Sequence, residues 1–297
     1  MEEQAITLEE DRALEAVWGR KVARLPDRGV LLISTDLQGH RRDYEAMKAV
    51  YAAEEAAGNQ PVLAFCGDMV HGPGAEIIES GRWPSHLGPA YIDQSDEILR
   101  DFESWTRKAR AFSLLGNHEH AHVGGPRVSR FHLDEAAALN AALGRDARRM
   151  REFMSSFPLL ATGRCGVVLC HGAPAATEAT AAAFETIRYD GFSHLSLFRM
   201  HGQGTLGALL WARCANEKQS SALLSTLRPD DKPAGFVVFG HDIVPEGIEK
   251  ESATQLRLST SFGVEDRNKA YLRLDLSRRY RSTDDLRDGQ EIRWLYR

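Results

Sequence analysis

Short apolar runs that end in glycine or a polar residue recur along this chain of 297 residues. Three of them, at 30–34, 61–66 and 111–115, lie early in the chain. A continuous apolar run bounded by turn residues is typical of a strand buried on both faces. A helical pattern that closes at Gly58 separates the first two runs. This β-α-β order predicts an α/β fold built on a parallel sheet.

Five of the predicted strands are followed by a side chain that metals accept as a ligand. These residues are Asp36, Asp68, Asn117, His171 and His241. The carboxyl ends of the strands in an open α/β sheet meet at one edge, where ligands bind. A lone polar residue after a strand is usually a turn residue, but five in succession favour a shared site. Mixed Asp, Asn and His ligands suit divalent ions such as Mn, Fe or Zn.

Residues 114–119 carry the strongest local signal, with the sequence Leu-Leu-Gly-Asn-His-Glu. Gly116 allows a sharp turn, and Asn117 and His118 are then expected on a loop at the strand end. Asn117 offers a neutral oxygen to a metal, and His118 offers a proton donor beside it. The alternative interpretation is a polar turn that caps the next helix. We interpret the histidines at 120 and 122 as part of a solvated loop, or alternatively as groups that contact substrate or stabilise the loop.

The remaining sequence predicts one domain with two additions. Residues 1–29 are expected to form an N-terminal accessory segment with a helix at 7–24, and residues 30–297 form the domain. Residues 175–232 show no alternating pattern and are expected to form a cap of helices and loops beside the active edge. Further helices are predicted at 95–110 and 133–157, and further strands at 167–170, 235–239, 255–260, 270–275 and 291–296.

Composition excludes several classes of function. The net charge is −5 and no block of Lys and Arg stands out, so binding to nucleic acid is not expected. No apolar run is long enough to span a membrane. The four cysteines form no zinc-binding spacing, and the first residues lack the apolar core of a secretory signal. We therefore expect a cytoplasmic protein with reduced thiols.

The strand-end residues also carry a resemblance to a known family. In order along the chain stand Asp36-Leu37-Gln38-Gly39, Gly67-Asp68, Gly116-Asn117-His118-Glu119, His171-Gly172 and Gly240-His241. This pattern resembles the calcineurin-like metallophosphoesterases, and within them the branch of serine/threonine phosphoprotein phosphatases and diadenosine tetraphosphatases. The resemblance spans residues 30 to about 275. It implies a sandwich of two mixed β-sheets flanked by helices, with two metals at its edge.

The resemblance also implies a role for each matching residue. Asp68 would bridge two divalent metal ions, and Asp36 would bind the first with Gln38. Asn117, His171 and His241 would bind the second. His118 would protonate the leaving oxygen, while Glu119 would orient the loop. Two cations about 3.5–4 Å apart can clamp the attacking and leaving oxygens of an in-line displacement.

Gln38 departs from the family pattern, because His is commoner at this position. An amide oxygen is a harder, neutral ligand than imidazole, so it favours Mn or Mg over Zn. The implied metals are therefore Mn first, with Fe, Zn and Mg as alternatives. We expect one tightly bound metal and one weakly bound, exchangeable metal.

A second departure concerns phosphate binding. His71 and Gly72 stand where the related phosphatases usually have an Asp that steadies the catalytic His and an Arg that grips phosphate. Another cation is therefore needed. Arg199 sits where the phosphatases have a second phosphate-binding Arg. Further candidates for substrate contact are Arg213, Arg127, Arg130 and His71.

Three functions remain open from the sequence. The first is hydrolysis of phosphomonoesters by attack of a metal-bridging hydroxide, as in a phosphoprotein phosphatase, with a phosphorylated protein or small molecule as substrate. The second is hydrolysis of dinucleoside polyphosphates or other nucleotides at the same centre. The third is a catalytically weakened module that binds phosphate. Ile243 stands where many non-phosphatase members have a second His, which favours the phosphatase-like branch.

Overall fold

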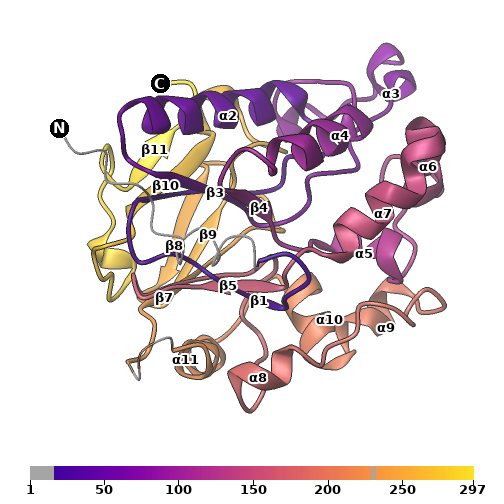
Figure 1. Cartoon of the computed structure of the whole chain (residues 1–297). Coiled ribbons are helices and arrows are strands. Elements are labelled where there is room, and N and C mark those ends of the chain that lie inside the picture. Colours follow the sequence, from indigo (N-terminus) through magenta and orange to yellow (C-terminus); the bar gives the residue numbers. More distant parts are fainter. Residues whose placement is uncertain (1–16, 229, 231) are drawn as a thin grey trace.

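Two β-sheets form the centre of the computed structural model, which describes residues 17–228, 230 and 232–297. The first sheet has the strand order β11-β10-β2-β3-β4 and the second has the order β1-β5-β6-β7-β9-β8 (Figure 1). The strands of the first sheet are β2 (Val30–Ser34), β3 (Pro61–Phe65), β4 (Ala111–Ser113), β10 (Ala270–Asp275) and β11 (Ile292–Trp294). Those of the second are β1 (Val22–Arg24), β5 (Leu160–Thr162), β6 (Val167–Leu169), β7 (Phe236–Phe239), β8 (Ile248–Ser252) and β9 (Gln255–Leu258).

Both sheets are mixed, as the sequence predicted. Strands β2, β3 and β4 run parallel, while β10 and β11 are antiparallel additions. In the second sheet, β6, β7 and β9 run parallel, while β5 pairs antiparallel with β6 and β8 pairs antiparallel with β9. The parallel strands therefore bring their carboxyl ends to one edge of each sheet.

Alternate side chains of β2 face in opposite directions, and both directions are buried. Leu31 and Ile33 pack in a core with Val167 and Phe236 of the second sheet. Leu32 belongs to a second core, which lies under the helices. Burial on both faces explains why the strand sequence is continuously apolar rather than alternating.

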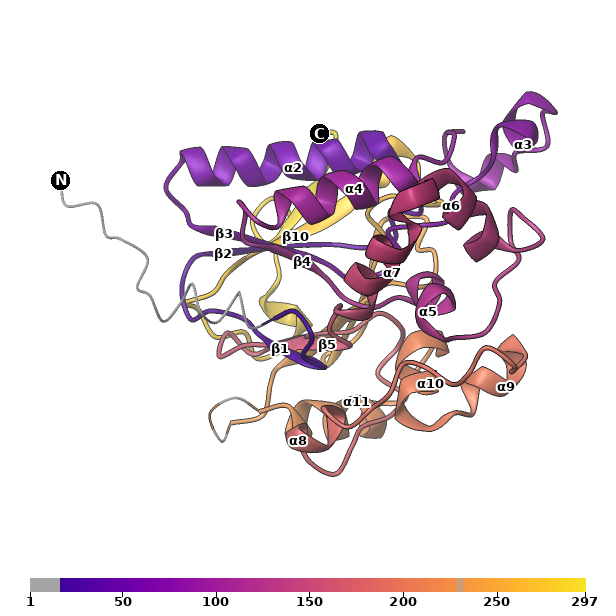
Figure 2. The ribbon, with the colours of Figure 1, turned by 45° about the vertical axis from the view of Figure 1, so that its right-hand side comes forward.

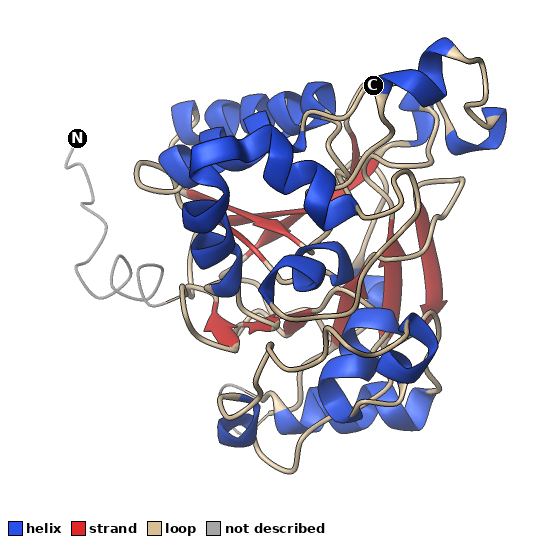
Figure 3. Cartoon of the chain, turned by 90° about the vertical axis from the view of Figure 1, so that its right-hand side faces the viewer, coloured by secondary structure: helices blue, strands red, loops and turns tan. Residues whose placement is uncertain are grey.

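Helices cover the two outer faces of the sandwich. Helices α2 (Arg41–Ala56) and α4 (Ser95–Trp105) lie over the first sheet, on the side opposite to the cap helices in Figure 2. Helices α5 (Asn117–Val123), α6 (Glu135–Leu143) and α7 (Ala147–Ser155) lie together at one end, and α3 (Ala75–Glu79) projects beside them. Viewed from that end, the strands lie between an upper and a lower group of helices (Figure 3).

The predicted cap at 175–232 consists of helices and loops, and its described residues contain no strand. Its helices are α8 (Ala181–Phe184), α9 (Leu197–His201), α10 (Gly204–Trp211) and α11 (Glu217–Thr226). The end of α10 is fastened to the segment after β6, because the Gly172 amide donates to the Leu209 carbonyl at 2.7 Å. The cap is thereby tied to the strand end that carries His171.

Three predicted elements need correction. The helix predicted at 7–24 is wrong at its end, where β1 pairs in parallel with β5; residues 1–16 lie outside the described part. The predicted helix at 133–157 is divided into α6 and α7, because Gly144 adopts a φ of +54° that interrupts it. Asn117 and His118, expected on a loop, and His120 and His122, interpreted as part of a solvated loop, lie in helix α5.

Helix α5 begins where it does because of a capping interaction. Gly116 is its N-cap, and the Glu119 carboxylate accepts the Gly116 amide at 2.9 Å. A Glu three residues after an N-cap satisfies an amide that would otherwise lack a partner.

Two short strands, β5 and β8, were not predicted. Among the described residues, no helix combines the length and hydrophobicity needed to cross a membrane.

Candidate active site

The five predicted strand-end residues come together at one edge of the two sheets. Asp36, Asp68 and Asn117 follow β2, β3 and β4, while His171 and His241 follow β6 and β7. Four of them line a cavity of about 340 Å³, and His171 lies buried beneath it. The cavity is lined by Asp36, Gln38, Asp68, Asn117, His118, Val128, Ser129, Arg130, Leu197, Trp211, Arg213, His241, Asp242, Ile243, Ser259 and Phe262.

The backbone is strained at this edge. Among the described residues, six that are not glycine have a positive φ, and five of these lie at the site. They are Asp36, Gln38, Asp68, His71 and His241, with φ between 43° and 72°. Such conformations cost about 1–3 kcal/mol each and persist where the surrounding structure enforces them, often at functional sites. At Asp36, Gln38, Asp68 and His241, the strained backbone turns the chain sharply and presents the side chain to the cavity.

Two glycines allow these turns to approach each other. A Cβ on Gly116 would collide with the Asp68 side chain and backbone amide. A Cβ on Gly240 would collide with the Asp36 carboxylate. The glycines are therefore required for the close approach of the strand ends. Gly240 and Asp36 follow strands of different sheets, so Gly240 allows the two sheets to meet at the site.

Three ligand atoms converge on one point. The Asn117 Oδ1 lies 2.8 Å from His171 Nε2 and 2.9 Å from His241 Nδ1, and the two nitrogens are 3.2 Å apart. The His171 Nδ1 lies 2.8 Å from the Cys66 carbonyl, so it carries the ring proton in the neutral imidazole. His171 Nε2 and Asn117 Oδ1 are then two lone-pair acceptors facing each other. A cation bound by both atoms would resolve this arrangement, and the Cys66 carbonyl would hold the imidazole in the orientation of a metal ligand.

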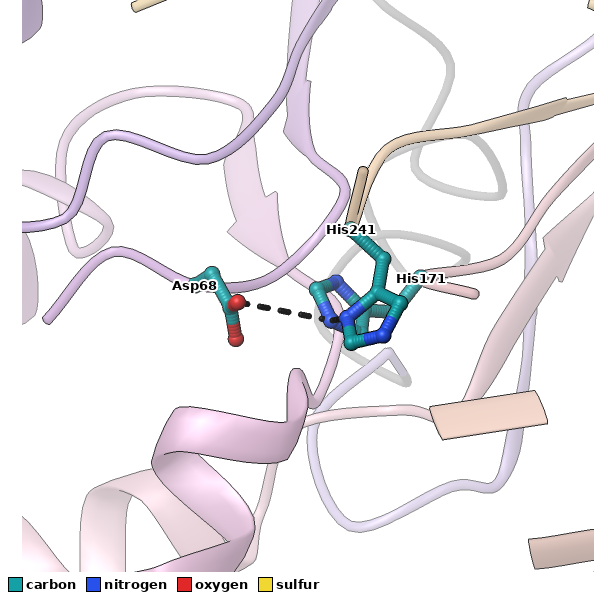
Figure 4. A group of neighbouring side chains, drawn as sticks. All are labelled: Asp68, His171 and His241. Atoms are coloured by element: carbon teal, nitrogen blue, oxygen red, sulfur yellow. Dashed lines mark hydrogen bonds and ion pairs between the residues drawn. The ribbon is translucent and has the colours of Figure 1, made fainter. Parts of the chain in front are cut away.

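Asp68 lies on the other side of this group. Its Oδ2 is 3.5 Å from His171 Nε2, and with His171 and His241 it forms a cluster suited to a metal ion (Figure 4). Asp36 lies near it, and its two oxygens accept the His241 amide at 3.1 Å. Burial and the neighbouring charge of Asp68 raise the pKa of Asp36 well above its usual range. Two buried carboxylates in proximity need positive charge to remain ionised.

The electrostatics of the imidazoles also suit metal binding. Burial, followed by the neighbouring His171, lowers the pKa of His241 to about 3. A neutral imidazole at physiological pH keeps a lone pair available for a metal. The residues present therefore fit divalent cations at this site.

The match to known proteins decides the family. The sequence profile of the calcineurin-like phosphoesterases matches residues 30–248. The chain belongs to the calcineurin-like phosphoesterases. It is therefore a metal-dependent hydrolase of phosphoric esters. Curated protein sequences include none that matches the chain.

Solved structures of phosphatases share the fold. A serine/threonine phosphatase from Saccharomyces cerevisiae, similar to human PP5, is 14% identical with a TM-score of 0.50, covering 96% of this chain and 85% of the other. A cold-active protein tyrosine phosphatase of a psychrophilic Shewanella is 12% identical with a TM-score of 0.54, covering 86% and 80%. At this identity the similarity concerns the fold alone.

Behind the candidate metal ligands, Glu119 holds two strand ends of this phosphoesterase together. Its Oε2 accepts the amides of Asp68 and Gly116 at 2.9 Å, and its Oε1 accepts the Met69 amide at 2.7 Å. This agrees with the expectation that Glu119 orients the loop. Burial, together with the charge of Asp68, raises the pKa of Glu119 to about 7.

His118 lines the cavity beside Asp68. Its backbone amide donates to Asp68 Oδ1 at 3.0 Å, and its Nε2 lies 3.9 Å from Asp68 Oδ2. Burial would lower the pKa of His118, but the charges of Asp68 and Glu135 outweigh burial and raise it. His118 is therefore placed to carry a proton at the wall of the cavity.

The histidines that follow His118 are buried and do not line the cavity. His120 Nε2 lies 2.8 Å from the Tyr189 carbonyl, and His122 Nε2 lies 2.8 Å from His71 Nε2. The interpretation of a solvated loop is therefore wrong. His120 attaches α5 to the segment after α8, which is one form of the stabilising role considered as the alternative.

Of the five residues that the sequence offered for substrate contact, the structure brings Arg213 and Arg130 into the cavity. Arg213 donates to Asp242 Oδ1 at 2.5 Å. Arg127 is turned away, because its guanidinium binds the Leu133 carbonyl and Asp134. Arg199 lies on the exposed face of α9 and does not line the cavity. His71 stands behind His118, with 2.9 Å between their Nδ1 atoms.

Arg130, a lesser candidate from the sequence, does line the cavity. Its guanidinium stacks 4.3 Å from the centre of the Phe262 ring, and its Nη1 lies 3.5 Å from Gln38 Oε1. Stacking on an aromatic ring orients a guanidinium while leaving its edge free to bind an anion. Neither Phe262 nor Trp211 was expected at the site, because an aromatic residue in a loop or at the end of a helix carries no sequence signal of the cavity that it will face.

Proposed function

We propose that this chain hydrolyses phosphomonoesters, in the manner of a phosphoprotein phosphatase, with two divalent cations held by the strand-end residues. The observation that carries the proposal is the convergence of Asp36, Asp68, Asn117, His171 and His241 beside His118. Asp68 would lie between the two cations. Asp36 and Gln38 would hold one, and Asn117, His171 and His241 the other. Mn is the metal that we expect, because the amide oxygen of Gln38 favours Mn over Zn.

The protein groups would divide the reaction among them. Bound divalent cations would supply positive charge to the phosphoryl oxygens and lower the pKa of a water molecule. Arg130 and Arg213 would neutralise the remaining charge on the equatorial oxygens. His118 would give a proton from Nε2 to the leaving oxygen as its bond to phosphorus breaks. The buried position of His118 would keep this proton from exchanging freely with bulk water.

The cavity favours a phosphomonoester over a dinucleoside polyphosphate. Its volume of about 340 Å³ is at the small end for ligand pockets. A polyphosphate chain carries several negative charges, whereas the arginines that line the cavity are Arg130 and Arg213, and the second is already paired with Asp242. The two proposed cations would serve the phosphoryl group being transferred, so these side chains leave little positive charge for further phosphates, and a single phosphoryl group fits better, with the rest of the substrate outside.

Three substrates test the proposal directly. The protein loaded with Mn should hydrolyse p-nitrophenyl phosphate and a phosphoserine peptide, and it should hydrolyse diadenosine tetraphosphate more slowly. Faster turnover of diadenosine tetraphosphate would support the alternative function. No activity on any of the three, with Mn bound, would contradict hydrolysis and favour a module that only binds phosphate.

Titration with Mn should show two unequal sites. We expect the site that includes Gln38 to bind more weakly, because an amide oxygen is a weaker donor than an imidazole nitrogen for every one of these metals, although the loss is smaller for Mn than for Zn. Replacing Gln38 by His should raise the affinity of this site for Mn by about 10-fold or more. Mutation of a residue that supports a metal ligand typically lowers metal affinity by about 10- to 100-fold, and a change of the ligand itself should have at least as large an effect. Isothermal calorimetry of the metal-free protein measures both affinities. Two equally tight sites in the native chain would contradict the expectation.

Arg130→Ala should raise KM for a phosphomonoester and lower kcat/KM by about 10- to 100-fold, since a hydrogen bond to a charged group contributes about 1.5–3 kcal/mol. Arg127→Ala is the matched control, because it removes a neighbouring arginine that does not line the cavity. Steady-state kinetics with p-nitrophenyl phosphate measures both variants. Equal effects of the two substitutions would remove Arg130 from the proposed mechanism.

A further inference from the structure

Glu135 is a buried carboxylate that the sequence did not single out. It is the first residue of α6, is 1% exposed, and lies directly behind His118. Its Oε2 is 3.4 Å from His118 Nδ1 and 3.2 Å from His71 Nδ1. A carboxylate is costly to bury unless its oxygens are bound. Oε2 makes no hydrogen bond of ordinary geometry, so the two imidazole nitrogens beside it are the groups that its charge faces.

We propose that Glu135 is the positioning residue of His118: its carboxylate binds the Nδ1–H of the ring and so turns Nε2 toward the cavity. The inference rests on the proposed role of His118 as the proton donor. An ionised carboxylate only accepts hydrogen bonds, so it selects the ring orientation and tautomer with a proton on Nδ1. The separation of 3.4 Å is longer than a tight hydrogen bond, as is common for catalytic pairs before substrate binds.

His71 and His122 could not set this orientation alone. The three imidazoles form a chain, in which His118 Nδ1 faces His71 Nδ1 at 2.9 Å and His71 Nε2 faces His122 Nε2 at 2.8 Å. Each imidazole nitrogen can either donate or accept, so the chain can be protonated in two opposite directions. Glu135 lies beside the first contact of the chain. A proton lies at that contact in either direction. His118 also lies beside Asp68, with 3.9 Å between His118 Nε2 and Asp68 Oδ2, so a proton on His118 is attracted by two carboxylates and this direction of the chain is favoured.

The ring geometry favours hydrogen bonds over a metal ion at this cluster, although its ligand atoms lie close enough to hold one. His71 and His118 have nitrogens 2.9 Å apart and ring centres 5.1 Å apart. The metal-site pair His171 and His241 has nitrogens farther apart, at 3.2 Å, but ring centres closer, at 5.0 Å. The nitrogens of the first pair therefore point more directly at one another, whereas those of the second converge at an angle on a third point.

The second oxygen of Glu135 holds the loop that carries Arg130. Its Oε1 accepts the backbone amides of Arg130 and Phe131 at 2.7 and 2.6 Å. The guanidinium of Arg130 lines the same cavity as His118. One carboxylate thus fixes the position of the proton donor through Oε2 and that of the proposed phosphate-binding loop through Oε1.

The substitution Glu135→Gln separates these two tasks. The amide oxygen of Gln can still accept the two backbone amides, while its NH₂ group replaces the negative charge that faces His118. With the full-length protein and Mn, we expect kcat for phenyl phosphate, whose phenolate is a poor leaving group, to fall by about 10- to 100-fold. Proton donation by a positioned acid contributes about 10²–10⁴-fold to the rate, and the substitution should remove part of this contribution. For p-nitrophenyl phosphate, whose leaving group needs little protonation, we expect kcat to fall by less than about 3-fold. KM should change little for either substrate.

Controls distinguish positioning from a general structural effect. Asp134→Asn alters the neighbouring carboxylate but keeps a side chain that can cap α6, so it should leave both activities unchanged. In the His118→Asn background, Glu135→Gln should cause no further loss. Equal losses on the two substrates, or no loss on either, would overturn the inference. A bound-metal content one ion lower than in the native protein would also overturn it, in favour of a metal at His71, His118 and Glu135.

A measurement on the native chain covers the case in which the variant does not fold. In protein loaded with Mg²⁺, ¹⁵N NMR of the neutral His118 ring should show the proton on Nδ1. A proton on Nε2 instead would overturn the inference. A native protein that hydrolyses neither aryl phosphate would contradict the proposed function itself, which is a different result from activity that is insensitive to Glu135.

Discussion

Asp68→Asn should lower kcat/KM for p-nitrophenyl phosphate by about 10³-fold or more. Asp68 is the carboxylate proposed to lie between the two cations, and it is 1% exposed at the floor of the cavity. Its loss would weaken both metal sites together. Stabilisation of phosphoryl charge by metals is worth several kcal/mol, and each 1.36 kcal/mol is a factor of ten in rate. Activity assays over a range of Mn concentrations measure the effect.

The same substitution should have little net effect on the stability of the metal-free protein. It relieves a repulsion, because burial and then the charge of Asp68 raise the pKa of Asp36, but it also removes an attraction, because the charges of His171 and His118 outweigh burial and lower the pKa of Asp68. Without metal, Asp68→Asn should therefore melt close to the melting temperature of the native chain. Added Mn should raise the melting temperature of the native protein more than that of the variant. Asp101→Asn, a carboxylate outside the cavity, is the control, and a similar loss of activity in it would contradict the argument.

Much of the fold follows from local sequence. The strands at 30–34, 61–65 and 270–275 are long enough to show a continuous or alternating apolar pattern, and the structure confirms them. Strands β1 and β5 have three residues each and pair with each other across more than a hundred residues of sequence. Their stability comes from that pairing and from burial, which no local pattern reveals. The break at Gly144 depends on a backbone conformation for which glycine is permissive but not diagnostic.

The site divides in the same way. Residues at strand ends were predictable, because the order of the parallel strands alone brings Asp36, Asp68 and Asn117 to one edge. Contributions from the loops were not predictable. The Arg130 side chain lines the cavity and the Arg127 side chain does not, although the two residues lie three positions apart in the same irregular segment. Glu135 was hidden for another reason: as the first residue of a helix, it carries the ordinary sequence signature of a helix N-terminus.

His118→Asn should lower kcat for a phosphoserine peptide by about 10²–10⁴-fold, which is the usual contribution of a general acid. A serine alkoxide is a strong base, so its departure depends on a proton delivered as the bond to phosphorus breaks. The variant keeps a polar side chain at a position whose backbone amide binds Asp68, so the metal-site geometry should survive. KM and Mn affinity should therefore change little. Phosphate-release assays and a Mn titration of the variant measure these quantities.

His120→Asn is the matched control, because His120 lies on the same short helix and is also buried. Its ring binds the Tyr189 carbonyl instead of facing the cavity. This substitution should lower stability, by about 0.5–1.5 kcal/mol for the lost hydrogen bond, and leave kcat nearly unchanged. If His120→Asn and His118→Asn lowered kcat alike, the loss would come from disruption of α5 and not from a missing proton. The contrast between the two histidines therefore tests chemistry separately from folding within one turn of helix.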